Sequence, residues 1–129
     1  MILLDTHAWI WWAAGSNRLP ATARHAIDGA SAVGVCAISL WEVAMLVAKR
    51  RLEMDRDPLE WLKQALALPR VELVQISPAI AVEAAALPST FPGDPADRLI
   101  VASARLTRAA IVTRDTRIRK FDGVTTIWG

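Results

Sequence analysis

Several patterns that mark common protein classes are absent from this sequence of 129 residues. It has a single cysteine, Cys36, so no intramolecular disulfide can form, and we expect the reducing environment of the cytoplasm. Its six glycines are scattered and form no phosphate-cradling loop. Its two histidines, His7 and His25, lie far apart and form no zinc motif with one cysteine. A disulfide scaffold and a zinc protein are therefore disfavoured.

Long hydrophobic runs are also missing. Charges interrupt each apolar stretch before it reaches the roughly 20 residues that a membrane-spanning helix needs. The opening segment, MILLDTHAW, has no basic residues before its apolar ones, so it does not resemble a secretory signal. We therefore expect no membrane attachment and a single domain over residues 1–129.

The sequence does contain an alternation of short apolar runs and helical segments. The runs do not alternate apolar with polar residues, which is typical of a parallel sheet covered by helices on both faces. The predicted strands are residues 2–4, 32–38, 71–76, 109–113 and 124–127. The predicted helices are residues 6–14, 20–28, 39–51 and 57–68, two that begin at Ser77-Pro78 and Asp94-Pro95, and a turn at 116–120. The fold class is α/β, with a central, mostly parallel sheet.

Four acidic residues follow these strands or begin the next helix: Asp5, Glu42, Asp97 and Asp115. The carboxyl ends of parallel strands share one edge of a sheet, so these side chains can converge on one site. Clustered carboxylates repel each other unless a cation or a proton neutralises them. The pattern therefore predicts a magnesium or manganese site and phosphodiester chemistry.

The four acids differ in how well helix capping alone explains them. Glu42 emerges from a largely apolar helix face, where an unpaired charge would cost several kcal/mol; a charge that reaches solvent or pairs with an arginine is the alternative. Asp97 likewise shares its face with aliphatic residues, although it could form a capping box with Asp94. Asp5 and Asp115, taken singly, could be only helix caps.

The charge of the chain is unevenly distributed. Residues 98–129 contain seven basic and two acidic residues, a net charge of +5, whereas residues 1–97 carry a net charge of −3. A basic region beside an acidic cluster suits a polyanion held near a metal. A solvated basic face, or a surface for an acidic protein partner, explains the same charge equally well.

The segment AWIWWAA, residues 8–14, is apolar on every side of the predicted helix. Such a helix is either buried all round or covered on its outer face by another chain. In a chain this small we expect the second arrangement, an oligomer or partner interface.

The sequence resembles the PIN-domain ribonucleases, and specifically the toxins of VapBC-type toxin–antitoxin pairs. Four segments carry the resemblance in order along essentially the whole chain: LLDTHAWIW at Asp5, ISLWEVA at Glu42, DPADRLIVASA at Asp97 and VTRD at Asp115. The resemblance implies a three-layer α/β/α sandwich and a divalent-metal-dependent endoribonuclease. It also implies that these four acids are catalytic and bind Mg²⁺ or Mn²⁺.

The same resemblance implies supporting residues and partners. Ser39 and Thr113 match hydroxyls that often accompany the acids, Arg98 matches a common Asp-Arg pair, and Thr6 follows Asp5 as a further supporting residue. The expected partners are an RNA substrate, a second copy of the chain in a homodimer, and an antitoxin that wraps the fold in a hetero-oligomer.

Two other functions remain open. One is a catalytically silent module that binds RNA or an antitoxin without cutting. The other is a phosphotransfer receiver or aspartyl-phosphate hydrolase, which needs a nucleophilic aspartate beside partner acids and usually a lysine near the last strands. Asp5 stands alone, and the first lysine after the fourth strand is Lys120, so the second function is disfavoured. DNA remains possible as a substrate.

Overall fold

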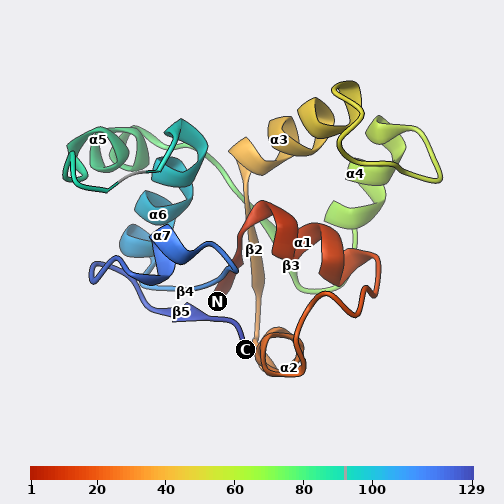
Figure 1. The fold of residues 1–129 in the computed structure, drawn as a ribbon, viewed down its shortest axis with the longest axis horizontal. Helices are drawn as coiled ribbons and strands as arrows, with labels where there is room; N and C mark the ends of the chain where they lie inside the picture. Colours follow the sequence, from red (N-terminus) through yellow and green to blue (C-terminus); the bar gives the residue numbers. More distant parts are fainter. Residues whose placement is uncertain (92) are drawn as a thin grey trace.

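The computed structural model describes residues 1–91 and 93–129, which form a five-stranded sheet between two layers of helices (Figure 1). The sheet has the order β3-β2-β1-β4-β5, and every neighbouring pair is parallel. The chain moves outward from the central strand β1 in both directions, so the end of β1 lies at a topological switch point. The strands are β1 (Ile2–Leu4), β2 (Val33–Cys36), β3 (Val71–Val74), β4 (Ala110–Val112) and β5 (Thr126–Ile127).

Helices cover both faces of the sheet. In Figure 1, α1, α2 and α4 lie on one side, α5, α6 and α7 lie on the other, and α3 packs against both α4 and α6. Among the described residues, no helix is long and apolar enough to cross a membrane. The helices are α1 (Thr6–Ala13), α2 (Ala21–Gly29), α3 (Ala37–Ala48), α4 (Pro58–Leu66), α5 (Pro78–Ala86), α6 (Pro95–Thr107) and α7 (Thr116–Arg119).

The predicted α/β class and the three layers are confirmed, and each predicted element is present with ends that differ by at most three residues. Side-chain caps explain why the helix starts were predictable. The side chains of Asp57 and Ser77 accept hydrogen bonds from backbone N–H groups in the first turns of α4 and α5, and a proline follows each cap. Gly15 ends α1 with a φ of +64°, a conformation that glycine adopts without strain.

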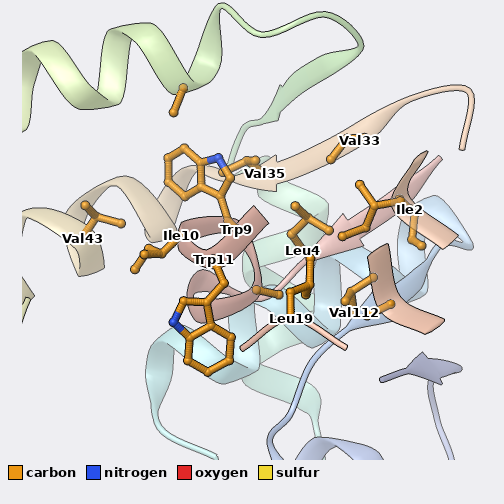
Figure 2. Close-up of a cluster of buried hydrophobic side chains, with 14 residues drawn as sticks. Ile2, Leu4, Trp9, Ile10, Trp11, Leu19, Val33, Val35, Val43 and Val112 are labelled. Carbon is orange, nitrogen blue, oxygen red and sulfur yellow. The ribbon is translucent and has the colours of Figure 1, made fainter. Parts of the chain in front are cut away.

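The core has one layer on each face of the sheet. Leu3 of β1 packs with residues of α6, whereas Ile2 and Leu4 point to the opposite face and pack with α1 (Figure 2). This alternation follows from the two-residue period of a strand. Both layers are buried, so residues of either parity in the central strands β1 and β4 are apolar, as the sequence predicts for a covered parallel sheet.

Coverage by another chain is not needed to explain Trp9, Ile10 and Trp11 of α1, because the chain buries these residues itself, whereas Trp12 and Ala13 are half-buried. Trp9 is fully buried and packs edge-on against Trp61 of α4, with ring centroids 5.2 Å apart. Trp11 is 8% exposed and lies 5.9 Å from the ring of Trp128 near the C-terminal end. The covering residues come from distant parts of the sequence, which a reading of local periodicity does not detect.

Candidate active site

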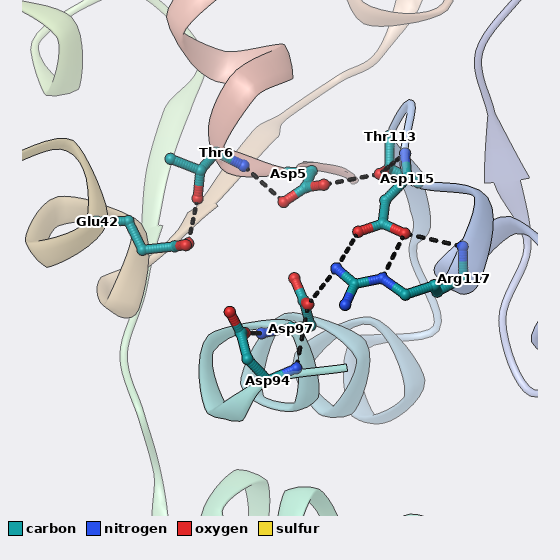
Figure 3. A network of polar contacts seen from close by, with 8 residues as sticks. All are labelled: Asp5, Thr6, Glu42, Asp94, Asp97, Thr113, Asp115 and Arg117. Carbon is teal, nitrogen blue, oxygen red and sulfur yellow. Dashed lines mark hydrogen bonds and ion pairs between the residues drawn. The ribbon is translucent and has the colours of Figure 1, made fainter. Parts of the chain in front are cut away.

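A cavity of about 280 Å³ lies where β1 and β4 end and α1, α3, α6 and α7 begin. All four predicted acids line it, so the convergence expected from the strand order is present (Figure 3). The cavity is lined by Asp5, Thr6, His7, Glu42, Asp94, Asp97, Arg114, Asp115 and Arg117.

Asp5 occupies the centre of this arrangement because it follows the central strand and caps α1. Its Oδ1 accepts a hydrogen bond of 2.8 Å from the N–H of Thr6, and its Oδ2 accepts one of 2.7 Å from the hydroxyl of Thr113. Thr113 follows β4, so the second bond joins the ends of neighbouring strands. Burial raises the pKa of Asp5, whereas the bond from Thr113 opposes the increase. Capping and a functional role are compatible here.

Glu42 enters the cavity from the second turn of α3. Its Oε1 accepts a hydrogen bond from the hydroxyl of Thr6, whose oxygen also lies 2.8 Å from that of the buried Ser39. Because the single hydroxyl proton of Thr6 goes to Glu42, Ser39 is the donor to Thr6. Burial raises the pKa of Glu42, and the negative charge of Asp5 adds to the increase. Two predicted supporting residues therefore hold Glu42 in place.

Asp97 lies in the first turn of α6 and forms the expected capping box with Asp94. The N–H of Asp97 donates to Asp94 Oδ1 at 2.9 Å, and the N–H of Asp94 donates to Asp97 Oδ2 at 3.2 Å. The Asp97 side chain is 11% exposed. Burial, followed by the charges of Asp94 and Asp5, raises the pKa of Asp97 to about 7. The cap therefore leaves a carboxylate whose ionised form is destabilised.

Asp115 caps α7 and pairs with Arg117, which the sequence reading did not select. The N–H of Arg117 donates to Asp115 Oδ1 at 2.8 Å, and its Nη2 lies 2.7 Å from Asp115 Oδ2 and 3.0 Å from Asp97 Oδ2. Figure 3 shows the guanidinium between the two carboxylates. The bond from the Arg117 side chain is the main cause of the lowered pKa of Asp115. The only sequence signal was a position two residues after a strand-end acid.

Arg98, a predicted supporting residue, is not brought into the cavity. Its guanidinium donates to backbone carbonyl oxygens in the last turn of α5 and in the residues that follow it, at distances of 3.2 to 3.5 Å. The acceptors belong to Ala84, Leu87, Pro88 and Phe91. Arg98 therefore stabilises the segment that leads to Asp94 and Asp97, and it acts at a distance from the acids.

Arg114 and His7 complete the mouth of the cavity. The guanidinium carbon of Arg114 lies 5.0 Å from the centroid of the Trp11 ring, a cation–π distance, and the His7 ring lies 5.7 Å from the same indole. Both side chains are exposed. The buried helix α1 thus positions a cation at the entrance to a group of acids.

The residue types that line the cavity suit a divalent cation, but the positions of their side chains do not. Carboxylate oxygens are the ligands that Mg²⁺ and Mn²⁺ prefer, and three of the four acids have raised pKa values, chiefly because burial destabilises their ionised forms. In residues 1–91 and 93–129, however, no three His, Cys, Asp or Glu side chains are arranged so that they could hold a metal ion. Arg117 supplies positive charge to two of the acids instead. A metal would require these side chains to rearrange.

Known proteins resemble this chain in sequence and in fold. A family model described as PIN domain matches residues 2–124. Ribonuclease VapC22 of Mycobacterium tuberculosis is 44% identical over 118 residues, which cover 92% of this chain and 89% of that protein. A toxin–antitoxin complex from Klebsiella pneumoniae contains a chain that is 25% identical, with a TM-score of 0.69 and coverage of 98% of this chain and 97% of that one.

A more distant structure agrees in fold alone. It is VapBC2 from Rickettsia felis bound to a DNA fragment from its promoter, in which the matching chain is 18% identical, with a TM-score of 0.72 and coverage of 98% and 97%. The match of the family model and the identity to VapC22 extend over most of the sequence. The chain therefore belongs to the PIN-domain family, as the four sequence segments predicted.

Proposed function

We propose that the protein is a divalent-metal-dependent endoribonuclease, the toxin of a toxin–antitoxin pair, which hydrolyses RNA phosphodiester bonds. The observation that carries this proposal is the convergence of Asp5, Glu42, Asp97 and Asp115 on one cavity at the switch point of a PIN fold. The similarity to a protein named ribonuclease supports RNA as the substrate.

In this proposal Asp5, Glu42 and Asp97 hold one Mg²⁺ or Mn²⁺, directly or through water, and Asp115 completes the site or helps to hold a second ion. The bound metal would lower the pKa of a water molecule, orient it and neutralise charge on the phosphate. The Thr113 hydroxyl orients Asp5 and a capping box orients Asp97, and both carboxylates would have to turn from these positions to bind the metal.

The hydroxyl groups of the site act on carboxylates and not on RNA. Ser39 is 0% exposed, Thr113 is 0% exposed and Thr6 is 2% exposed, so none of them can reach a phosphodiester as a nucleophile. Each makes a hydrogen bond within the network around Asp5 and Glu42. Water is therefore the nucleophile that the site leaves room for.

We further propose that an antitoxin restrains the protein and that the chain forms a homodimer. The protein and its antitoxin would act in the cytoplasm. Structural neighbours that are toxin–antitoxin complexes support the antitoxin. Large apolar side chains at the surface of α3 and α4 offer a contact area for a protein, since Trp41 is 58% exposed and Leu59 is 61% exposed. The buried, unpaired Cys36 suits a reducing compartment.

One experiment tests reaction, metal and substrate together. Purified protein is incubated with total RNA in Mg²⁺, Mn²⁺ or EDTA, and new RNA ends are mapped. Asp97→Asn serves as the control, because asparagine retains the acceptor oxygen that receives the Asp94 N–H while it removes the charge. We expect ends that require metal and that Asp97→Asn does not produce. Equal cleavage by this variant would refute the assignment of the site.

The silent binding module remains the second candidate, favoured by one observation. In the described part of the chain no ready group of metal ligands exists, and Arg117 already forms ion pairs with two of the acids. RNA binding that survives EDTA, without cleavage at any metal concentration, would support this alternative over the enzyme.

A further inference from the structure

Arg117 lies on the wall between two spaces. One is the acid cavity; the other is a neighbouring groove of about 600 Å³. The side chain of Arg117 is 45% exposed, although its Nη2 lies within 3.0 Å of two carboxylates. The remaining residues that line the groove are Thr90, Phe91, Thr116, Lys120, Phe121 and Asp122.

Both acids also have backbone hydrogen bonds that do not involve the guanidinium. Asp97 is already held by its capping box with Asp94, through bonds of 2.9 and 3.2 Å. Asp115 is held by the backbone N–H of Arg117 at 2.8 Å, a bond that any residue except proline would make at this position. The Arg117 side chain therefore adds positive charge to two acids that backbone bonds also hold. It occupies the position from which a cation would neutralise both acids.

We propose that Arg117 is a phosphate-binding residue that is stored on Asp97 and Asp115 in the free protein. There it competes with the divalent cation, and it transfers to a backbone phosphate when an RNA strand lies in the groove. This inference rests on the proposed function. The guanidinium suits both partners, because its planar set of N–H donors binds carboxylate and phosphate alike.

The groove has two basic residues and two hydroxyls that suit a nucleic-acid strand, against one acidic residue, Asp122. Lys120 is exposed and supplies a second positive charge, while the exposed hydroxyls of Thr90 and Thr116 can donate to phosphate oxygens. Phe121 is half-buried and gives the groove an apolar wall. A strand in the groove would therefore meet Arg117 beside the acids that are proposed to cut it.

Competition and transfer make metal and RNA binding cooperative. Metal must displace Arg117 when RNA is absent, whereas RNA removes the guanidinium from the acids in advance. Each ligand should therefore increase the affinity for the other by the same factor, since coupling of binding free energies is reciprocal. A residue with only a structural role would produce no such coupling.

The first test measures the affinity for Mn²⁺ alone, by calorimetry on protein treated with EDTA and dialysed. Arg117→Gln should bind Mn²⁺ at least about tenfold more tightly than the wild type, because the competing charge is gone. The matched control is Arg119→Gln, which removes an exposed arginine of the same helix that does not line the cavity and should leave the affinity unchanged. Equal or weaker binding by Arg117→Gln would overturn the inference.

A second variant guards against misfolding. Arg117→Lys keeps the charge but loses the planar donor set, so its affinity for Mn²⁺ should lie between those of the wild type and Arg117→Gln. Circular dichroism melting without metal confirms that each variant is folded before titration. If Arg117→Lys binds Mn²⁺ as tightly as Arg117→Gln does, charge competition is refuted.

The third measurement repeats the Mn²⁺ titration with a short single-stranded RNA that has a phosphorothioate backbone, checked for intactness afterwards. The RNA should tighten Mn²⁺ binding to the wild type by at least about fivefold and have little effect on Arg117→Gln. Lys120→Gln should weaken RNA binding. The slope of log affinity for RNA against log salt concentration should fall by the amount expected for about one phosphate contact. Coupling of equal size in Arg117→Gln would overturn the transfer.

The outcomes separate this inference from the function on which it rests. If the wild type cleaves RNA with Mn²⁺ but Arg117→Gln binds Mn²⁺ with the same affinity as the wild type, the proposal that Arg117 competes with the metal is wrong. The nuclease proposal then stands. If the wild type neither binds Mn²⁺ nor cleaves RNA, both are wrong.

Discussion

The two halves of the acid cavity control negative charge in different ways. Asp5 and Glu42, which come from the first half of the chain, accept hydrogen bonds from the neutral hydroxyls of Thr113 and Thr6. Asp97 and Asp115, from the second half, share the positively charged Arg117. Hydroxyls fix the direction of a carboxylate but leave its charge, whereas a guanidinium also neutralises it. An added cation beside Asp5 and Glu42 would therefore stabilise the protein without displacing the positively charged Arg117.

The largest effect is expected from Glu42→Gln in the first half. The variant keeps an acceptor for the Thr6 hydroxyl and loses the charge, so the fold should remain while metal-dependent cleavage falls at least about a hundredfold, or about 2.7 kcal/mol of transition-state stabilisation. Initial rates on RNA with Mn²⁺ provide the measurement. Glu53→Gln, at an exposed position outside the cavity, is the control. Near-normal cleavage by Glu42→Gln would contradict a metal site that includes both halves.

The second expected effect is on stability against pH without metal. The pKa of Asp97 is raised from 3.8 to about 7, first by burial and then by Asp94 and Asp5. Between these values the folded protein binds more protons than the unfolded chain, so a rise in pH favours unfolding. The contribution of Asp97 to the free energy of unfolding is complete below about pH 4 and is lost as the pH rises past about 7. The change should be roughly 1–3 kcal/mol, measured by urea unfolding.

Two controls isolate Asp97 in this profile. Asp97→Asn should flatten the dependence, since the titrating group is absent. Saturating Mn²⁺ should restore stability above neutral pH, because a cation binds the ionised carboxylates and not the protonated ones. A wild-type profile that is flat without metal would show that the Arg117 charge already balances Asp97.

A smaller effect is expected from Thr113→Val, which removes the hydroxyl between the two halves. This buried hydroxyl donates to Asp5 and accepts from the N–H of Asp115 at 3.0 Å. Loss of the hydroxyl leaves the Asp5 carboxylate and the Asp115 N–H without this partner. The free energy of unfolding should therefore fall by about 1–2 kcal/mol in urea denaturation. The exposed Thr125 offers the matched control, Thr125→Val, which should change stability much less. If both variants lose the same amount, the hydroxyl does not join the halves as described.

The sequence predicted the elements and the meeting of the acids, because both depend on local signals. Caps such as Ser77 mark helix starts, and strand ends that share an edge bring acids such as Asp5 and Asp115 together whatever the loop details are. The coverage of α1 could not be predicted, because Trp61 and Trp128 are distant in sequence. The position of the Arg117 side chain depends on the direction in which a four-residue helix leaves β4, and no periodicity encodes that direction.

The packing around Trp11 has a spectroscopic consequence. Its indole contacts Arg114 and His7 at the cavity mouth and Trp128 at the other end of the chain. Indole emission responds to nearby charge and to the loss of a stacked cation, so a ligand that draws Arg114 away alters the light that Trp11 emits. Among the six tryptophans of the chain, an emission change that Trp11→Phe abolishes would therefore report occupancy of the site in unlabelled protein.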